Sequence, residues 1–342
     1  MRYRDAGVDV GRSDAIKADL ARAVESTWGA AVRPLRGGFA GVMGWPGAGA
    51  GEVLLAATLD GVGSKLDLAR QAGRLGDAAA DLVYHGANDL LVHGARPLAL
   101  LDYVAQARLE PEVVLEIVEG LARACREVGA ALLGGETAEM PDTYRPGAVD
   151  VAACMIGEVA AGRLLDGGAV RPGDVVLGLR SDGLHTNGYT LARRVLAASG
   201  LALADPLPGG SGEDLGAALL APHRWYGPAL VPALGAGEVH ALAHVTGGGL
   251  AGNLVRVLPE GCRARIDPAA WPRPALFRWL IGAGGVPEED ARATFNLGIG
   301  MAVVCAPERA PALAVALRAR GEHVTGIGTI VAGTRGVEWA EP

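Results

Sequence analysis

The chain has 342 residues, half of them apolar and only 20% charged, which is long enough for two domains with their own cores and too apolar for a disordered protein. Its formal net charge of −7, without a basic stripe, excludes a sequence-independent nucleic-acid surface, so we expect no nucleic-acid partner. No apolar run approaches the length of a membrane span, the N-terminus lacks the apolar core of a signal peptide, and the cysteines are scattered. We therefore expect a cytoplasmic protein without a membrane partner.

Glycine and apolar runs alternate through the first half. A glycine-rich loop at residues 37–51 is followed by apolar runs that predict buried strands at residues 53–59, 130–133 and 149–159. Between them a helix is predicted to begin at Pro111 and to end at Gly129, because proline suits a first helical turn and glycine a C-terminal stop. The strand at 130–133 is expected to leave through a glycine turn at Gly134 and Gly135.

The sequence RPGD at residues 171–174 breaks the pattern just before a new apolar run. We therefore place a domain boundary there, which gives an N-terminal domain of residues 1–169 and a C-terminal domain of residues 170–342. The second half predicts strands at residues 175–179, 241–245, 263–266 and 300–304, and helices at residues 190–198 and 311–318.

Three acidic residues stand near the ends of apolar segments, each beside glycine or asparagine. Asp60 begins the sequence DGVGSK, Asp89 lies in ANDL, and Glu136 lies in GGETAE. Each alone fits an ordinary cap or turn residue equally well. Together they predict a shared Mg²⁺–phosphate cluster, because carboxylates supply hard oxygen ligands and glycine lets the backbone approach a ligand. Lys65 would then neutralise phosphate charge, although lysines near helix starts are usually only solvated.

A competing pattern lies in the second half. Residues 247–252 (GGGLAG) satisfy G-x-G-x-x-G, follow an apolar strand, and precede Asp267 at the spacing of a dinucleotide fingerprint. This leaves a nicotinamide-dependent dehydrogenase open as a distant alternative. The segment lies mid-chain without a doubly wound alternation around it, so an anion-binding turn is the better interpretation.

Two histidines stand beside polar, glycine-rich turns, where a histidine can bind phosphate or transfer a proton. They are His185, in DGLHTNGY, and His244, in AHVTG. A hydrogen-bonded structural histidine explains each of them equally well. The other histidines have no comparable setting: His85, His93, His223, His240 and His323.

Taken in order, the motifs resemble one family, the aminoimidazole ribonucleotide synthetases, or phosphoribosylformylglycinamidine cyclo-ligases, of purine biosynthesis. The matching segments span nearly the whole chain: residues 3–9 (YRDAGVD), 37–39 (GGF), 60–66 (DGVGSKL), 88–90 (NDL), 101–103 (LDY), 134–141 (GGETAEMP), 185–189 (HTNGY), 243–249 (AHVTGGG), 256–259 (RVLP) and 294–301 (TFNLGIGM). The chain departs from the family pattern where Leu59 replaces a threonine, at residues 84–86 (YHG), and where His223 lies in PHRWY.

This resemblance implies an α/β fold of the α+β type in two domains. Residues 1–169 would bind ATP and Mg²⁺ and form a homodimer through a ferredoxin-like mixed sheet, and residues 170–342 would complete the site with a sandwich-like α/β domain. The implied reaction is ATP-dependent ring closure of formylglycinamidine ribonucleotide (FGAM) to 5-aminoimidazole ribonucleotide (AIR), with release of ADP and phosphate. Phosphorylation of the formyl oxygen would precede attack by the amidine nitrogen. A requirement for K⁺ stays open.

The resemblance also assigns residues to roles. The metal ligands would be Asp60, Asp89 and Glu136, and the catalytic residues His244, Asp89 and Lys65. The nucleotide would contact Lys17, Gly37, Gly38, Phe39, Asp60, Asn88, Asp89, Gly134, Gly135, Glu136, Thr137 and Glu139. The substrate would contact His185, Thr186, Asn187, Thr246, Gly247, Gly248 and Gly249.

Related ATP-dependent enzymes of the same superfamily remain alternatives. Thiamine-monophosphate kinase and selenophosphate synthetase share the acidic phosphate site with the resembled family. A selenophosphate synthetase would carry a reactive cysteine or selenocysteine near its N-terminus, whereas the first cysteine here is Cys125. A catalytically idle nucleotide-binding protein is a further alternative, and the intact acids at Asp60, Asp89 and Glu136 count against it.

Overall fold

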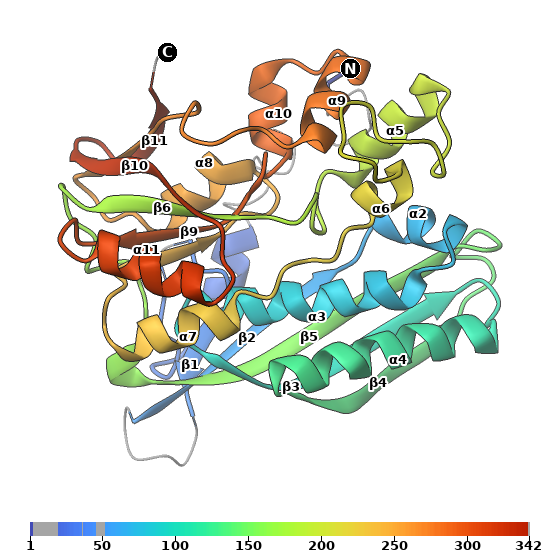
Figure 1. The fold of residues 1–342 in the computed structure, drawn as a ribbon. Coiled ribbons are helices and arrows are strands. Elements are labelled where there is room, and N and C mark those ends of the chain that lie inside the picture. The colour runs from blue at the N-terminus through green and yellow to red at the C-terminus, as the bar shows by residue number, and fades with distance from the viewer. Residues whose placement is uncertain (3–19, 36, 46–51, 341–342) are drawn as a thin grey trace.

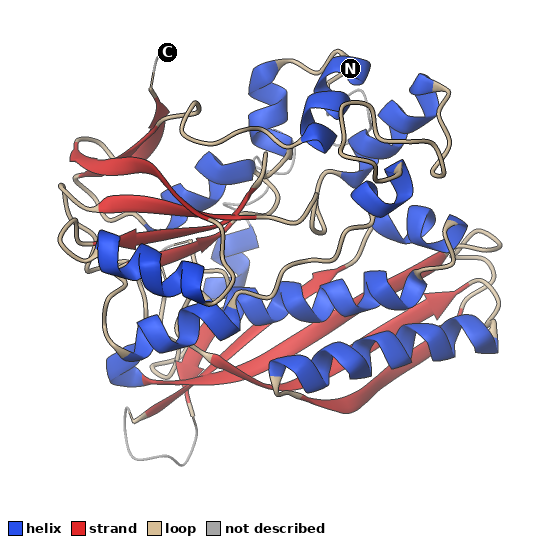
Figure 2. Cartoon of the chain, in the orientation of Figure 1, coloured by secondary structure: helices blue, strands red, loops and turns tan. Residues whose placement is uncertain are grey.

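The computed structural model describes residues 1–2, 20–35, 37–45 and 52–340, and it contains two β-sheets with helices packed against them (Figures 1 and 2). The mixed α/β fold expected from the sequence is confirmed. The expected N-terminal motif at residues 3–9 and the candidate Lys17 lie outside the described residues. Within the described part of the chain, no helix combines the length and apolar character needed to cross a membrane.

The first sheet has five strands, in the spatial order β1 (Gly41–Gly44), β2 (Val53–Gly61), β5 (Val149–Ala160), β3 (Arg96–Gln106) and β4 (Ala131–Glu139). Among the described strands of this sheet, only β3 and β4 form a parallel pair. Helices α3 (Leu75–Leu91) and α4 (Pro111–Val128) lie along one face of this sheet, and α2 (Lys65–Gln71) follows β2 (Figure 1). The opposite face of the sheet carries the alternate side chains of each strand, and neither α3 nor α4 covers it.

Helix α4 has the ends that its sequence predicts. Pro111 lies in the first turn, and Gly129 adopts a left-handed conformation (φ 76°) that ends the helix. Ile117, Leu121 and Cys125 are buried on its inner face, at the spacing of one helical stripe.

Helix α3 is buried along almost its whole length. It packs on strands of the first sheet and also contacts α7 (Gly227–Gly235) of the second half. At the end of α3, the Asn88 amide donates to the Arg224 carbonyl (2.8 Å) and its side-chain oxygen accepts from the Tyr226 N–H (3.2 Å). This helix therefore joins the two domains, and its polar side chains are held between them.

The expected turn at Gly134 and Gly135 is wrong, because β4 runs straight through both glycines to Glu139. Gly134 has φ 138°, and the ladder with β3 is irregular at the neighbouring Leu100–Leu101 step. A Cβ on Gly135 would lie 2.1 Å from the Asp102 carbonyl oxygen. The glycines therefore serve a close strand-to-strand approach and a bulge, which sequence alone does not separate from a turn.

The second sheet has six strands, in the order β11 (Gly336–Trp339), β8 (Cys262–Ile266), β10 (Val324–Ala332), β6 (Val175–Arg180), β9 (Ile299–Cys305) and β7 (Ala241–His244). Its strands are antiparallel neighbours except for the parallel β11–β8 pair. Each strand expected here agrees with the structure to within one residue at either end.

The remaining helices of the second half are α5 (Tyr189–Ser199), α6 (Leu215–Leu219), α8 (Gly249–Leu254), α9 (Ala275–Gly284), α10 (Glu288–Thr294) and α11 (Ala310–Ala319). Short 3₁₀ turns occur at Ala161–Arg163 and Val255–Val257. The loops before α5 and α7 and the end of β7 reach the buried face of α3, where the polar side chains of the two domains meet.

Candidate functional site

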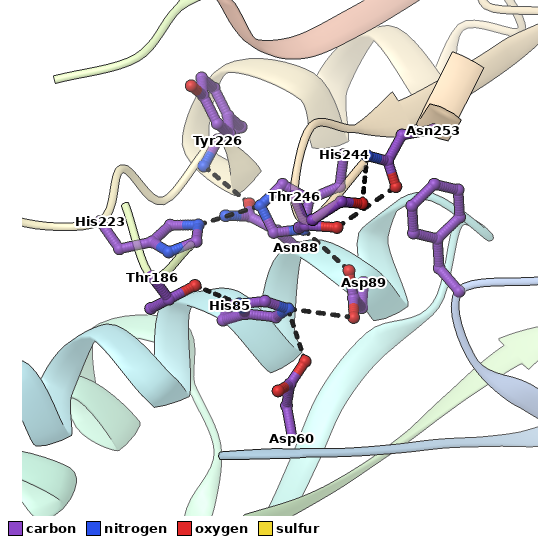
Figure 3. A network of polar contacts seen from close by, with 12 residues as sticks. Asp60, His85, Asn88, Asp89, Thr186, His223, Tyr226, His244, Thr246 and Asn253 are labelled. Atoms are coloured by element: carbon purple, nitrogen blue, oxygen red, sulfur yellow. Dashed lines mark hydrogen bonds and ion pairs between the residues drawn. The ribbon is translucent and has the colours of Figure 1, made fainter. Parts of the chain in front are cut away.

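Helix α3 presents three ionisable side chains to the second domain. Asp81, His85 and Asp89 are spaced four residues apart, so they lie on one face of the helix. All three are buried. Figure 3 shows a polar network that runs from Asp60 on β2 through His85 and Asp89 to His244 at the end of β7.

His85 lies between two carboxylates. Its Nε2 is 2.9 Å from Asp60 Oδ2 and 3.6 Å from Asp89 Oδ2, and its Nδ1 is 2.6 Å from the Thr186 hydroxyl. Burial alone would lower the pKa of His85, but the charges of Asp89 and Asp60 raise it above its ordinary value. Burial would likewise raise the pKa of Asp60, but the hydrogen bond from His85 lowers it. The two carboxylates therefore favour the charged form of the His85 imidazole.

His244 continues the network inward. Its Nδ1 donates to Asp89 Oδ1 (2.8 Å), which leaves Nε2 as the ring nitrogen with the lone pair, and the Nε2 atoms of His244 and His223 are 2.9 Å apart. The pKa of His244 is lowered by burial, although the bond to Asp89 opposes the shift. His244 is therefore a neutral imidazole of fixed tautomer in the region where we expected proton transfer.

Lys65 does not face this cluster as a free phosphate ligand. It is almost wholly buried, its ammonium group forms an ion pair with Asp81, and it donates to the His185 carbonyl (3.0 Å). Burial would lower the pKa of Lys65, but Asp81 raises it. The charge of Lys65 is therefore matched inside the protein in this structure, and its expected role in neutralising phosphate stays a prediction.

Glu136 does not join Asp60 and Asp89 within one chain. In the ladders, Asp60 pairs with Ala153, Ala153 with Asp102, and Asp102 with Gly135, so Glu136 is three strands away from Asp60. Because side chains alternate along a strand, Glu136 also points to the opposite face of the sheet. The expected cluster of Asp60, Asp89 and Glu136 is therefore not formed by a single chain.

The other β4 candidates follow the same strand. The Glu139 carboxylate accepts from the Leu109 N–H (2.9 Å), so it holds the loop before α4. Thr137 pairs with Val104 of β3. These two residues lie along the far edge strand of the sheet, away from Asp60.

The Gly37–Gly38–Phe39 segment is held in place by contacts from both domains. The Phe39 N–H donates to His93 Nε2 (2.9 Å), and the Phe39 ring lies under the Arg256 guanidinium (3.6 Å to the ring centre). Arg256 also donates to the carbonyls of Gly37 and Gly38, each at 2.7 Å. Beside the segment is a cavity of about 560 Å³ with a largely apolar lining that includes Trp28. The segment thus forms one wall of a preformed hollow large enough for a nucleobase.

The hydrogen bonds of His93 to Phe39 and Leu165 make its contribution to the stability of the protein depend on pH. Nδ1 donates to the Leu165 carbonyl (2.9 Å) while Nε2 accepts from Phe39, so the ring must be neutral, and burial lowers its pKa. The unfolded chain gains a proton below about pH 6.5, and the folded state gains one only at lower pH. The stabilisation is therefore complete above pH 6.5 and is lost as the pH falls, by at most about 1.4 kcal/mol per pH unit.

We expect His93→Gln to be less acid-sensitive than the parent protein by about 1 kcal/mol between pH 6.5 and pH 5.5. Urea unfolding of both proteins at both pH values measures the change in the free energy of unfolding. The contribution of the other histidines is the same in both proteins and cancels in the comparison. An equal loss of stability in both proteins would contradict a neutral His93 in the folded state.

The candidate substrate segments adjoin one another. Asn187 donates to the Thr186 hydroxyl (3.3 Å), and a Cβ on Gly247 would lie 3.2 Å from the Asn187 side-chain oxygen. Thr246 donates to Asn253, which in turn donates to the carbonyls of Gly247 and Gly249 and so shapes the glycine turn (Figure 3).

His185 differs from its neighbours. It is buried, has a left-handed backbone (φ 62°), and stacks on His223 at 4.1 Å between ring centres. The ring therefore lies inside the domain contact and is covered by another imidazole.

Three residues that are central to this contact were not predicted from the sequence: Asp81, His85 and His223. His223 bonds to His244 through its ring and to Asp81 through its backbone N–H (2.7 Å). Two signals could have found them. The four-residue spacing of Asp81, His85 and Asp89 marks one face of a helix, and His85 and His223 both stand at departures from the resembled family.

The GGGLAG segment is not part of a dinucleotide-binding fold. It follows β7, which is an edge strand paired antiparallel to β9, and it leads into the six-residue helix α8. Dinucleotide fingerprints connect parallel strands through a helix. A Cβ on Gly249 would lie 1.9 Å from the Arg292 carbonyl oxygen, so the glycine is needed for close packing. The dehydrogenase alternative loses its structural support.

Comparison with protein families gives two adjacent matches. Residues 40–159 match the AIR synthase related protein, N-terminal domain, and residues 171–340 match the AIR synthase related protein, C-terminal domain. Together the two matches cover most of the chain and each contains one of the two sheets.

Solved structures share the fold at low sequence identity. The crystal structure of tt0281 from Thermus thermophilus is 24% identical, with a TM-score of 0.60 and coverage of 88% of each chain. Thiamine-monophosphate kinase from Stenotrophomonas maltophilia K279a is 22% identical, with a TM-score of 0.58 and coverage of 94% of each chain. Thermotoga maritima PurL complexed with FGAR is 18% identical, with a TM-score of 0.59, and the match covers 90% of this chain but 44% of that one.

Proposed function

This chain belongs to the AIR synthase-related family, and we propose that it catalyses the ATP-dependent ring closure of FGAM to AIR with release of ADP and phosphate. The observation that carries the proposal is the meeting of Asp60, Asp89 and His244 in one network of polar contacts that runs through His85. The three residues come from three separate segments of the sequence that resemble the cyclo-ligases, and the fold brings those segments together between the domains.

The chemistry requires activation of a poor electrophile. Transfer of the ATP γ-phosphoryl group to the formyl oxygen of FGAM turns that oxygen into a leaving group. The amidine nitrogen then attacks the same carbon, a C–N bond forms, the C–O bond breaks, and phosphate leaves. The attacking nitrogen loses a proton to a base. Phosphoryl transfer depends mainly on positioning of the reactants and on neutralisation of phosphate charge. Binding of the substrate in a folded-back conformation holds its two reacting groups together and so favours ring closure.

Asp60 and Asp89 are the residues that would hold Mg²⁺. Their oxygens converge on His85 Nε2, at 2.9 and 3.6 Å, and carboxylate oxygens are the ligands that Mg²⁺ prefers. When bound, the ion would neutralise phosphate charge on ATP. Structures of Thermotoga maritima PurL complexed with AMPPCP and with ADP support a nucleotide at this kind of fold.

His244 is the proposed base. Asp89 accepts its Nδ1 proton and would stabilise the imidazolium that forms when Nε2 takes a proton from the substrate nitrogen. In this structure Nε2 is bonded to His223, so the substrate must replace His223 as the partner of that nitrogen. His185, Thr186, Asn187 and the turn at residues 246–249 are proposed to surround the ribose phosphate.

We also propose a homodimer through the open face of the first sheet. Leu59, Cys154 and Leu101 are neighbours in one cross-strand row, and Leu59 and Leu101 are 72% and 42% exposed. Leu133 on the edge strand is 65% exposed. Contiguous exposed apolar side chains on a sheet mark an interaction surface, and a second copy would cover it symmetrically. Glu136 points to this face and would approach a nucleotide only across such an interface.

We expect Leu101→Asp to convert the dimer into monomers at micromolar concentration, because each dimer would bury two unpaired carboxylates. Sedimentation velocity measures the change. Leu115→Asp is the matched control, since Leu115 is 57% exposed on α4, which covers the other face of the sheet. A parent protein that is monomeric, or a Leu101 variant that stays dimeric, would rule out this interface.

The proposed function is tested by a coupled assay for ADP release with purified protein, ATP, Mg²⁺ and FGAM. We expect ADP release to depend on FGAM and to yield AIR in equal amount. ADP release without FGAM, or no release with it under conditions where the protein is folded, would reject the ring-closure assignment.

A second candidate is phosphorylation of thiamine monophosphate. One observation favours it, because the likeness to a thiamine-monophosphate kinase covers 94% of both chains, whereas the likeness to PurL covers less than half of that protein. The same assay with thiamine monophosphate in place of FGAM decides between the two reactions.

A further inference from the structure

Four buried imidazoles gather where the domains meet, more than the proposed reaction uses. Three of them belong to the second domain: His185 lies between β6 and α5, His223 precedes α7, and His244 ends β7. The rings of His185 and His223 are stacked, and the centres of the His223 and His244 rings are 5.0 Å apart. Figure 3 shows His223 directed at His244.

The nitrogens of these three rings are close enough to share one ion. One ring nitrogen from each of His185, His223 and His244 lies within 4.8 Å of the others, and the nearest pair is 2.9 Å apart. Tetrahedral zinc with Zn–N bonds of about 2.0–2.1 Å requires nitrogens about 3.3 Å apart. Side-chain movements of about an ångström would therefore complete the geometry.

The cluster also has hydrogen-bonding capacity that the described residues do not use. Nδ1 of His185 and Nδ1 of His223 are buried and have no hydrogen-bond partner within the described part of the chain. Burial and then the neighbouring imidazoles lower the pKa of His223 well below its ordinary value, and burial does the same for His185. Neutral rings keep a lone pair, which is the form that binds metals.

His244 already has the outer support of a metal ligand. Its Nδ1 donates to the Asp89 carboxylate, and this bond fixes the ring so that Nε2 is free of a proton. A carboxylate behind a histidine is the common arrangement for orienting a metal-bound imidazole.

We propose that His185, His223 and His244 form a binding site for a divalent transition-metal ion, with Zn²⁺ as the ion that suits it best and Asp89 as the outer carboxylate. Three neutral nitrogens favour Zn²⁺ or a similar imidazole-binding ion over Mg²⁺, which prefers oxygen. The site is therefore distinct in chemistry from the proposed Asp60–Asp89 cation site. An ion here would occupy the lone pair of His244, so the metal-bound form is expected to be inactive in ring closure.

A second grouping, His85 with Asp89 and His244, is the weaker candidate. His85 Nε2 is already bonded to Asp60, and the Asp89–His244 hydrogen bond would have to break. At the tri-histidine site the ion would replace the His223–His244 bond, with the His223 ring proton moving from Nε2 to the unpartnered Nδ1, and would compete at most with the long Arg224 N–H bond to His185 Nε2 (3.5 Å). The nearby positive charges are balanced, because Lys65 is paired with Asp81 and Arg224 with Asp182 and Glu322.

Zn²⁺ binding by the chelator-stripped full chain tests the proposal without reference to turnover. A chromophoric chelator in competition measures stoichiometry and affinity, and we expect a single tight site per chain. We expect His223→Gln to weaken binding by at least about 100-fold. His85→Gln separates the two groupings and His323→Gln, at an exposed histidine, is the matched control; both are expected to bind like the parent.

Several outcomes would overturn the proposal. They are the absence of tight Zn²⁺ binding by the parent chain, loss of binding in His85→Gln with retention in His223→Gln, and equal binding by all three variants, which would mean surface coordination. Melting of each variant in chelator shows whether it folds. If His223→Gln does not fold, the Co²⁺ spectrum of the parent protein decides: intense visible bands indicate a four- or five-coordinate nitrogen site, and weak bands of octahedral oxygen ligation contradict it.

Discussion

Replacing Lys65 with methionine is expected to lower the free energy of unfolding by about 3–5 kcal/mol. The Lys65 ammonium and the Asp81 carboxylate are 1% and 2% exposed and form an ion pair, so the variant leaves a buried carboxylate without its counter-charge. Lys65 also donates to the His185 carbonyl (3.0 Å), which ties α2 to the loop before α5. Urea unfolding at neutral pH measures the change.

A double variant shows whether the unmatched charge is the cause. In Lys65→Met with Asp81→Asn, the charge is removed while the Asn side-chain oxygen can still accept the His223 N–H that Asp81 accepts at 2.7 Å. We expect the double variant to recover at least about half of the loss, which would be a coupling typical of directly paired residues. Arg96→Met, which breaks the exposed Arg96–Glu158 pair, is the control and is expected to cost less than about 1 kcal/mol.

If Lys65→Met kept its stability and lost only ATP-dependent turnover, Lys65 would be a phosphate ligand after all. The two interpretations differ because one rests on a local motif and the other on tertiary packing. The place of Lys65 in DGVGSK indicates a ligand-binding loop, whereas its partner Asp81 lies sixteen positions later on another helix. Only the packing of α2 against α3 brings the pair together.

Elements with local signals were predictable from the sequence. Proline and glycine mark the ends of α4, and a continuous apolar run marks β5, so both agree with the structure. The GGETAE segment also has a clear local pattern, two consecutive glycines, but this pattern fits two different structures. Glycine can make a turn or permit a close approach between strands, and the Asp102 carbonyl that requires Gly135 belongs to β3.

Site residues that stand in a recognisable sequence motif were predictable. Site residues that come together only because they share one face of a helix were not. Asp60, Asp89 and His244 were found from their motifs, and the structure joins them. Asp81 and His85 were missed because residues 75–91 were not assigned to a helix, and their four-residue spacing has meaning only on one. Glu136 was grouped with the other acids because a motif does not show to which face of a sheet a side chain points.

Asp89→Asn is expected to reduce FGAM-dependent ADP release by about 100-fold or more. The Asp89 carboxylate has two functions in the proposed site. One oxygen accepts the Nδ1 proton of His244 (2.8 Å), and the other, with Asp60, faces His85 and the proposed Mg²⁺. An asparagine removes the negative charge. Its amide group can donate to His244 Nδ1, which would move the ring proton to Nε2 and remove the lone pair needed for proton transfer.

The rate assay is paired with two measurements that a merely structural role would not change together. Thermal melting with Mg²⁺ and ATP should show a smaller nucleotide-induced stabilisation in Asp89→Asn than in the parent, and the pH–rate profile should lose the limb that reports His244. Asp77→Asn is the matched control, because Asp77 lies on the same helix and pairs with Arg74 and Arg123 at the surface. Turnover of Asp89→Asn close to that of Asp77→Asn would remove Asp89 from the site. A normal rate with a weakened nucleotide effect would instead separate cation binding from proton transfer, and it would leave the His244–Asp89 pair without a role in the chemistry.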